Sequence, residues 1–334
     1  MRLHGLDLAR FFALFGMVVV NFKVASGAIV SGDVLPAITG AFEGRAAATF
    51  VVLAGIGLGL SARKSINYLV IFKRAAFLMV IGLLNMLIFD ADIIHYYAVY
   101  FLFGALFLRA NLPTLITAII ALNLIALTLL LGLDFDSGWN WDTYQYSDFW
   151  TLSGFTRNLF YNGWHPVFPW LSFLLFGLIL ARLDLSAKAI QLRLIAWGLS
   201  IWAAAEILSA ALQAWAGGAA ELVILVQTSP VPAVPLYIIA GAGAASTVIG
   251  ACLLLGDRLR PLAVTGRQTL SLYFGHIFIG MGVMQATGLL AQPPLWQAVV
   301  ASLLFTLLAV IYANIWVRIA DRGPVEAIMR RIAG

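Results

Sequence analysis

Ten apolar runs separated by polar gaps constrain the fold of this 334-residue chain more than any other feature. A helix needs about 20 mostly apolar residues to cross the hydrocarbon core of a bilayer. We therefore expect an all-α integral membrane protein, a single membrane domain over residues 1–334 with about ten transmembrane helices. The runs lie at residues 9–30, 46–62, 75–89, 93–109, 112–133, 166–182, 192–215, 233–255, 268–288 and 295–318.

The gaps between these runs differ in their content of Lys and Arg. Of the 20 such residues, all but Lys23, Arg45 and Arg157 fall in alternate gaps or at the termini. Short loops rich in Lys and Arg stay cytoplasmic, which predicts that both termini are cytoplasmic and that the number of crossings is even. The cations of the cytoplasmic set are Arg2, Arg10, Arg63, Lys64, Lys73, Arg74, Arg109, Arg182, Lys188, Arg193, Arg258, Arg260, Arg267, Arg318, Arg322, Arg330 and Arg331.

The composition excludes several classes of protein. With 62% hydrophobic and 10% charged residues, the chain has too little polar surface for a soluble domain. Its net charge of +5 comes from residues beside the apolar runs, so we expect membrane lipids as partners and no nucleic acid. The lone Cys252 and four histidines without zinc-site spacing predict no metal. A homodimer is the other assembly we consider.

Three polar residues on different helices lie deep within predicted spans, where such groups are costly and mark functional sites. At 1.5 Å per residue, Asn21 lies about 16 Å beyond Arg10, His276 about 13 Å beyond Arg267, and Glu206 about 20 Å from Arg193. Tyr273 is three residues before His276 and shares its helix face. His276 is either a packed histidine bonded to a neighbouring helix or a general base, and both interpretations stay open.

An Asp–His pair begins the fourth run. Asp92 and His95 are three residues apart, a spacing at which the carboxylate can fix the imidazole tautomer and raise its basicity. The alternative is a solvated helix start, where acidic residues favour the helix N-terminus. His165 precedes Pro166 and is expected to lie at the outer end of its helix.

The outer segments 31–45, 134–165 and 217–232 are too long for simple turns and are expected to be functional or locally structured. The middle segment is rich in Trp and Tyr. It is either an aromatic belt at the membrane surface or a stacking surface for a sugar-like acceptor.

The basic residues have two predicted uses. Lys23, Arg45 and Arg157 lie on the outer side, where they can neutralise nearby carboxylates or an acidic acceptor. Most cytoplasmic cations are orientation signals or contacts to lipid phosphates, and Arg10 is also expected to pair with Asp7. A subset facing a cavity can hold the phosphates of a nucleotide-bearing donor, and the candidates are Arg10, Arg74 and Arg267.

Five segments carry a family resemblance. They begin RLHGLDLARFF, GRAAATF, DIIHYY, GWHPVFPW and GRQTLSLYFGH, and lie at residues 2–23, 44–59, 92–97, 163–182 and 266–276. In this order they resemble the membrane proteins related to heparan-α-glucosaminide N-acetyltransferase and the YeiB-like bacterial families. The resemblance implies a transmembrane acyltransferase fold in a bacterial inner membrane, with acyl-CoA donating from the cytoplasm and an acceptor modified on the far side.

The resemblance also bears on individual residues. Asn21 matches the family's Asn at the end of the first helix, a proposed catalytic position. The lysosomal enzyme places a catalytic His shortly after that Asn, whereas residues 22–26 here contain none. The resemblance therefore leaves His95, His165 or His276 to supply a base.

We expect an acyltransferase that moves an acetyl or similar short acyl group from acyl-CoA to an extracytoplasmic glycan, lipid or small molecule. Asn21 would bind the developing oxyanion, and His95 oriented by Asp92, or else His276, would take the acceptor proton. Lys23, Arg45, Arg157, His165 and Tyr273 are the candidates for contacts with the acceptor. The alternatives are a transporter or lipid flippase that binds cargo with the same polar groups, and a catalytically silent membrane scaffold.

Overall fold

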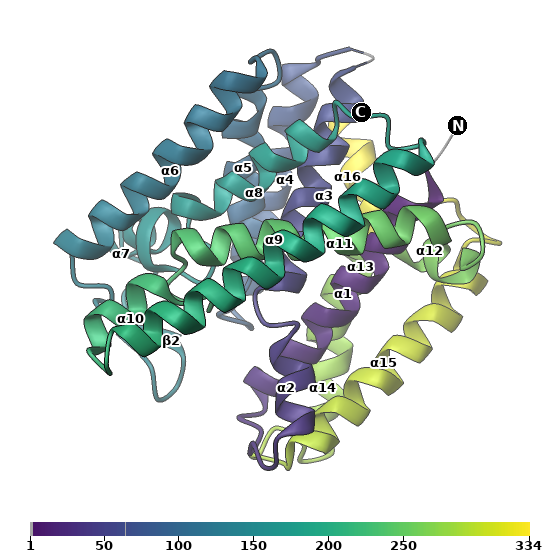
Figure 1. The fold of residues 1–334 in the computed structure, drawn as a ribbon. Helices are drawn as coiled ribbons and strands as arrows, with labels where there is room; N and C mark the ends of the chain where they lie inside the picture. Colours follow the sequence, from purple (N-terminus) through teal and green to yellow (C-terminus); the bar gives the residue numbers. More distant parts are fainter. Residues whose placement is uncertain (1–2, 64) are drawn as a thin grey trace. The chain divides into compact units, whose positions relative to one another are not determined.

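The computed structural model describes residues 3–63 and 65–334, so Arg2 and Lys64 of the predicted cytoplasmic set lie outside the described residues. The described chain is mostly helical, with one two-stranded hairpin (Figure 1). The elements are α1 (His4–Ala25), α2 (Val34–Gly40), α3 (Arg45–Ala62), α4 (Tyr68–Met86), α5 (Ile94–Leu106), α6 (Leu112–Gly132), β1 (Trp139–Asn140), β2 (Gln145–Tyr146), α7 (Leu152–Arg157), the π-helix η1 (Asn158–Asn162), α8 (Val167–Leu180), α9 (Lys188–Trp215), α10 (Ala220–Val226), α11 (Pro235–Leu255), α12 (Arg260–Gly266), α13 (Thr269–Gly275), the π-helix η2 (His276–Met281), α14 (Gly282–Ala286), α15 (Leu295–Trp316) and α16 (Pro324–Ala333).

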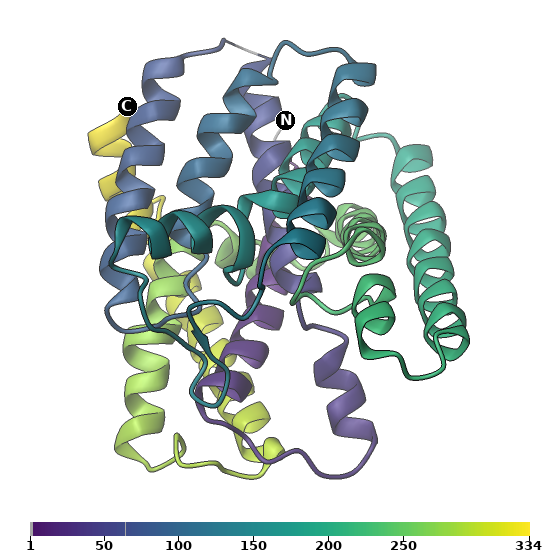
Figure 2. The ribbon, with the colours of Figure 1, turned by 90° about the vertical axis from the view of Figure 1, so that its left-hand side faces the viewer.

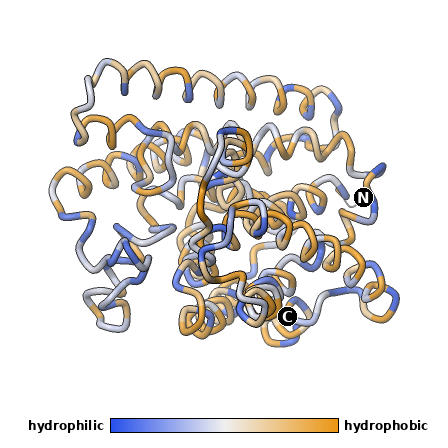
Figure 3. Tube along the Cα trace, turned by 90° about the horizontal axis from the view of Figure 1, so that it is seen from below, coloured by the Kyte–Doolittle hydropathy of each residue, from blue (hydrophilic) through white to orange (hydrophobic). Residues whose placement is uncertain are grey.

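Long apolar helices confirm the expected class, an all-α integral membrane protein. Within the described residues, seven helical segments are long and apolar enough to cross a membrane, or eight if α7 with η1 and α8, bent by 51°, form one span. Large apolar side chains on them face outward, among them Leu131, Ile207 and Leu308. Figure 3 shows hydrophobic residues running along these helices, and many hydrophilic ones gathered in the connections.

The count is lower than the ten spans expected from the sequence. The run at residues 93–109 folds into α5, which has only 13 residues. The run at residues 268–288 is divided among α13, η2 and α14. An apolar run thus overestimates helix length where a turn or a π-helix interrupts it.

Local sequence explains several helix starts. Asn67 accepts a hydrogen bond from the Val70 N–H at 3.1 Å at the start of α4, and Asn111 accepts one from the Thr114 N–H at 2.9 Å at the start of α6. These are N-cap contacts, which satisfy amide groups that have no partner within the helix. The long outer segments are locally structured, as expected: they contain α2, the β1–β2 hairpin with α7, and α10.

The chain divides into two compact units. Unit 1 comprises residues 1–50, 185–196 and 245–331, and unit 2 comprises residues 51–184, 197–244 and 332–334. The boundaries fall inside α3, α9, α11 and α16, so each of these helices contributes to both units. The expectation of a single membrane domain stays a prediction.

Unit 1 is organised around α1. This helix packs on α12 and α15, as labelled in Figure 1, and α1 (purple) and α15 (yellow) can be followed again in Figure 2. The contact with α12 is close, because a Cβ atom at Gly266 would lie 1.7 Å from the carbonyl oxygen of Asp7. Beyond α1, the Ile29 N–H donates to the Pro293 carbonyl oxygen at 2.8 Å. The loops that follow α1 and α14 are therefore joined.

Unit 2 is organised around α5 and α8. The helix α4 packs on α5, and α8 packs on both α5 and α6. A Cβ atom at Gly177 of α8 would lie 2.2 Å from the Val52 carbonyl oxygen, so glycine permits close packing on α3. At Gly82 a Cβ atom would lie 2.4 Å from the backbone nitrogen of His95. That glycine sets the distance between α4 and the start of α5.

Candidate functional site

A buried polar relay lies where α4 gives way to α5 in unit 2. The Asp92 carboxylate accepts hydrogen bonds from Asn85 Nδ2 at 2.8 Å, from the His95 backbone N–H at 3.0 Å and from His95 Nδ1 at 2.9 Å. All three residues are fully buried. The pairing expected from the three-residue spacing is present, and the solvated helix start does not describe this segment.

The relay determines the tautomer of His95. A carboxylate only accepts hydrogen bonds, so the Nδ1 atom carries the ring proton and Nε2 presents its lone pair. Within the described residues Nε2 is buried and has no hydrogen-bond partner. The arrangement has the chemistry of a general base held by a carboxylate. Leaving a buried acceptor such as Nε2 without a hydrogen bond costs about 1–3 kcal/mol. A ligand that donates to Nε2 would remove this cost, which is consistent with a binding role for this atom.

The ring of Tyr96 connects His95 with the segment that precedes α8. Its centroid lies 3.9 Å from that of His95 and 5.9 Å from that of His165. Tyr96 donates to Asn158 Oδ1 at 2.5 Å, and Tyr100 donates to the His165 carbonyl oxygen at 2.5 Å. The two tyrosines therefore fix the Trp164–His165 segment next to the relay.

Among the described residues, Asn85 Oδ1 of the relay is also buried without a hydrogen-bond partner, and so are three atoms outside it: His165 Nδ1, Trp164 Nε1 and Trp170 Nε1. The His165 and Trp170 rings contact each other at 4.6 Å. His165 is also close enough to His95 to interact with it electrostatically. We call His95, Tyr96, His165 and Trp170 the His95 cluster.

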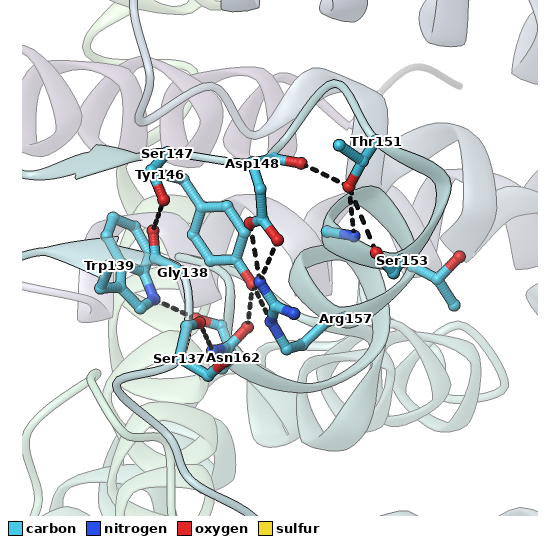
Figure 4. Close-up of polar contacts among 12 residues, drawn as sticks. Ser137, Gly138, Trp139, Tyr146, Ser147, Asp148, Thr151, Ser153, Arg157 and Asn162 are labelled. Carbon is cyan, nitrogen blue, oxygen red and sulfur yellow. Dashed lines mark hydrogen bonds and ion pairs between the residues drawn. The ribbon is translucent and has the colours of Figure 1, made fainter.

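The β1–β2 hairpin is held by Arg157 (Figure 4). The guanidinium donates to both Asp148 oxygens, at 2.7 and 2.8 Å, and to the Tyr146 hydroxyl at 2.7 Å. Tyr146 in turn donates to Asn162 Oδ1 at 2.7 Å. Burial raises the pKa of Tyr146 above its ordinary value although Arg157 opposes this, so the phenol keeps its proton at neutral pH. The out-of-place Arg157 thus neutralises a neighbouring carboxylate, one of the two uses expected from the sequence.

The π-helix η1 delivers the asparagines of this region. Asn158 Oδ1 accepts a hydrogen bond from the Tyr96 hydroxyl. Asn162 Nδ2 donates to the carbonyl oxygens of Phe135 and Ser137 at 2.8 Å each. A π-turn shifts side chains relative to an α-helix and is frequent at functional sites. Here it ties the hairpin and the His95 cluster to one short element.

Aromatic rings cover the hairpin. Trp139 and Trp141 are stacked with centroids 4.6 Å apart, and Trp164 meets Trp139 edge-on at 5.2 Å. Trp139 Nε1 donates to the Asn162 carbonyl oxygen, and Trp141 Nε1 donates to Asp136, each at 2.7 Å. The indoles of Trp139 and Trp141 are therefore each fixed by a hydrogen bond. Both interpretations of this surface, an aromatic belt and a stacking platform, stay open.

Unit 1 contains a different histidine pair. Asn21 Nδ2 lies 2.9 Å from His276 Nε2, and because the amide nitrogen can only donate, Nε2 is the acceptor. His276 is fully buried and begins η2, and its ring contacts those of Tyr273 at 5.0 Å and Phe22 at 6.2 Å. Its Nδ1 atom is buried and has no hydrogen-bond partner among the described residues. Two of the three deep polar residues predicted from the sequence, Asn21 and His276, thus bond to each other.

The remaining predicted cations of unit 1 have protein partners. Lys23 pairs with Glu43 at 2.6 Å, Arg45 donates to the Glu43 carbonyl oxygen at 3.2 Å, and Arg10 pairs with Asp7 at 2.6 Å as expected. Arg267 donates to the Asp321 carbonyl oxygen at 3.0 Å. Because Gly266 packs on Asp7, Arg10 and Arg267 lie at the same end of unit 1. Arg74 is partly buried in α4 of unit 2.

Sequence reasoning missed several polar residues of these sites. Asn85 lies inside an apolar run seven residues before Asp92, and an amide at that depth is itself a signal for function. Asn158 and Asn162 follow a helix in a long loop, where polar residues are common and carry no such signal. Glu326 accepts from the Leu270 and Ser271 N–H groups at the start of α13, from 55 or more residues away. No local pattern predicts that contact.

Comparison with known families gives two matches. Residues 2–213 match the model described as heparan-alpha-glucosaminide N-acetyltransferase, catalytic. Residues 179–334 match a protein family of unknown function, DUF418. Comparison with curated proteins and with solved structures gives no match. The relay, the rest of the His95 cluster and Asn21 lie in the first matched range, whereas His276 and Arg267 lie outside it.

Proposed function

This chain belongs to the heparan-alpha-glucosaminide N-acetyltransferase catalytic family, a family of membrane acetyltransferase-like proteins, and we propose on that basis that it moves an acetyl or similar short acyl group from acyl-CoA to an extracytoplasmic glycan, lipid or small molecule. The observation that carries the proposal is the Asn85–Asp92–His95 relay. It leaves His95 Nε2 buried, basic and without a partner among the described residues.

In the proposed reaction His95 acts as general base. Nε2 takes the proton of the acceptor nucleophile as that atom attacks the thioester carbonyl carbon. A bond forms from the nucleophile to the carbonyl carbon, the carbon–sulfur bond breaks, and His95 returns the proton to the sulfur, so coenzyme A leaves as a thiol. Asp92 stabilises the imidazolium that exists between the two transfers, and Asn85 holds Asp92 in place.

We assign the donor to the cytoplasmic side. Arg10 and Arg267, at one end of unit 1, are proposed contacts for its phosphates, since a guanidinium donates in pairs to phosphate oxygens. Arg74, in unit 2, is a separate candidate for the same role. A bacterial inner membrane would give such a protein acyl-CoA on one face and an envelope glycan or lipid on the other. Lys23, Arg45 and Arg157 are the proposed cations of the acceptor side, each already held by a protein group there.

The test is acyl transfer by the purified full-length protein. It is incubated with radiolabelled acetyl-CoA and a membrane extract as the acceptor source, and label outside coenzyme A is counted. We expect protein-dependent transfer that His95→Gln lowers by about 10²-fold or more, the usual contribution of a general base. The matched control is His4→Gln, which makes the same change at the start of α1 and should keep the wild-type rate.

Two results would contradict the proposal. Absence of label transfer from acetyl-CoA and from longer acyl-CoA donors would reject acyl transfer. Protein-dependent movement of a labelled lipid between the leaflets of a liposome, without acyl transfer, would favour the transporter or flippase. Equal rates for wild type and His95→Gln would leave an acyltransferase but remove His95 as its base.

A further inference from the structure

We infer that the acceptor presents a hydroxyl group at His95, so that the product is an ester and not an amide. This inference rests on the proposed function. It comes from the hydrogen-bonding capacity of three polar atoms in and beside the His95 cluster that have no partner among the described residues: His95 Nε2, Trp164 Nε1 and Trp170 Nε1.

A ligand bound at the His95 cluster and the adjacent Trp164 needs both a hydrogen-bond donor and a hydrogen-bond acceptor. His95 Nε2 carries a lone pair, so the ligand must donate to it. The indole groups of Trp164 and Trp170 only donate, so the ligand must accept from them. A hydroxyl group does both through one oxygen atom. A protonated amine donates only and would leave both indoles unsatisfied.

The charge of the cluster also favours a neutral nucleophile. A primary amine arrives mostly as an ammonium ion at neutral pH and needs a carboxylate partner when it is buried. Asp92 is the carboxylate of the relay, and it already accepts from Asn85 and twice from His95. An ammonium ion could pair with it only by displacing His95. A hydroxyl enters uncharged and requires no such exchange.

The relay matches the chemical requirement of a hydroxyl. An alcohol is a weak nucleophile until a base removes its proton in the transition state, and a carboxylate-oriented imidazole is a recurrent solution to that problem. An amine needs only to lose the extra proton of its ammonium form, and the neutral amine then attacks a thioester without a base in the transition state. A fully buried Asn–Asp–His relay therefore serves O-acylation more than N-acylation.

The ligand must also fit beside aromatic rings. Tyr96 lies against His95, and Trp170 lies against His165, so the surroundings of the two imidazoles are made of ring faces and edges. Ring carbons of a sugar or a polyol pack well on such surfaces while the hydroxyl groups use the polar atoms. We therefore assign the acceptor to the class of hydroxyl-bearing glycans and glycolipids.

The deciding experiment is the chemistry of the product bond. Wild-type protein in detergent is incubated with radiolabelled acetyl-CoA and membrane extract, with His95→Gln as the background. Protein and coenzyme A are removed, and the labelled product is treated with hydroxylamine at alkaline pH. We expect nearly all label above background to be released as the hydroxamate, because oxygen esters react and amides do not.

The outcomes separate the two proposals. Label that resists hydroxylamine is an amide, which would overturn the hydroxyl acceptor while acyl transfer stands. Absence of any protein-dependent label rejects the proposed function and this inference with it.

A second measurement tests the indole donor. Trp170→Phe keeps an aromatic ring and removes the N–H group, so we expect about a tenfold rise in the extract concentration that gives half the maximal rate. The maximal rate should change much less. The matched control is Trp197→Phe, whose side chain is 69% exposed on α9 and should leave both values unchanged. An unchanged half-saturating concentration for Trp170→Phe would remove this indole from the acceptor site.

Discussion

Unit 1 and unit 2 each bury one histidine completely and bond its ring to a polar side chain, yet they leave different atoms for chemistry. His276 uses Nε2, the outer ring nitrogen, to accept from Asn21. His95 uses Nδ1 to donate to Asp92 and keeps Nε2. The comparison teaches that burial and depth alone do not identify a base. The ring nitrogen that the protein itself engages decides whether a histidine packs helices or moves protons.

The largest effect on acetyl transfer should come from changing Asp92, the residue that leaves His95 Nε2 with its lone pair and so distinguishes His95 from His276. In Asp92→Asn the new amide can donate to Nδ1, which moves the ring proton to Nε2 and removes the lone pair from the cluster. We expect the rate of acetyl transfer to fall by about 10³ to 10⁴-fold, the loss typical of a wrong tautomer. Initial rates with saturating acetyl-CoA measure this change.

The control for that variant is Glu206→Gln, another carboxylate-to-amide change in unit 2. Glu206 accepts from Trp202 Nε1 at 3.0 Å and from the Thr228 hydroxyl at 2.6 Å. It should keep at least a third of the wild-type rate. A rate for Asp92→Asn within tenfold of wild type would show that the carboxylate does not set the tautomer that catalysis needs.

The next effect tests how unit 2 positions His95. In Gly82→Ala the added methyl group would lie 2.4 Å from the His95 backbone nitrogen, so α4 and α5 must separate. We expect a loss of stability of about 1–3 kcal/mol, as for other overpacked sites, together with lower activity. Thermal unfolding followed by intrinsic tryptophan fluorescence measures the stability.

Gly132→Ala makes the same substitution at the end of α6, where a Cβ atom would meet no other atom within 4 Å. It should be neutral or stabilising by up to about 1 kcal/mol. Equal melting temperatures for the two variants would mean that α4 and α5 do not approach as closely at Gly82 as the structure has them.

The sequence predicted the membrane class, the polar residues at depth and the Asp92–His95 contact, because each depends on local spacing or composition. Helix length, the i,i+3 rule and the cost of burying polar groups all act within one segment. The same reasoning placed Asn21 and His276 at similar depth. It could not say that they bond, because that requires the packing of α1 against the segment 255 residues later.

The errors have the same physical origin. The ten apolar runs gave too many spans, since hydropathy does not register the π-helix at His276 or the short length of α5. Asn158 and Asn162 gained their roles from a π-turn and from contacts with Tyr96 and Tyr146, which lie 62 and 16 residues away. Tertiary contacts of this kind leave no periodic trace in a single sequence.

A smaller effect on stability and activity should follow when the Asn21–His276 hydrogen bond of unit 1 is removed. Asn21→Ala removes the donor to His276, and interhelical hydrogen bonds of this kind stabilise membrane proteins by about 0.6–1.7 kcal/mol. We expect a stability loss in that range and a transfer rate reduced by less than tenfold. Asn123→Ala, which removes a bond from α6 to Ser172 of α8, is the matched control for stability.

A different result for Asn21→Ala would change the comparison between the units. Loss of an oxyanion-hole donor lowers kcat by about 10² to 10³-fold. A fall of that size with unchanged stability would return Asn21 to the oxyanion role that the family resemblance implies. Unit 1 would then carry chemistry as well as packing.

The smallest effect concerns the outer cations, where the two units again differ. Lys23 makes one ion pair with Glu43, whose side chain is 37% exposed, whereas Arg157 is fixed by Asp148 and Tyr146 together. An exposed single pair contributes only about 0.2–1 kcal/mol, because water screens the charges and the long side chain loses freedom. We therefore expect Lys23→Met to lower the melting temperature by no more than about 3 °C. Lys188→Met, at the exposed start of α9, provides the baseline for removing a surface charge. Lys23→Met can instead lower acetyl transfer tenfold or more while the melting temperature stays near that baseline. In that case Lys23 takes part in acceptor binding, and the ion pair with Glu43 only positions its side chain.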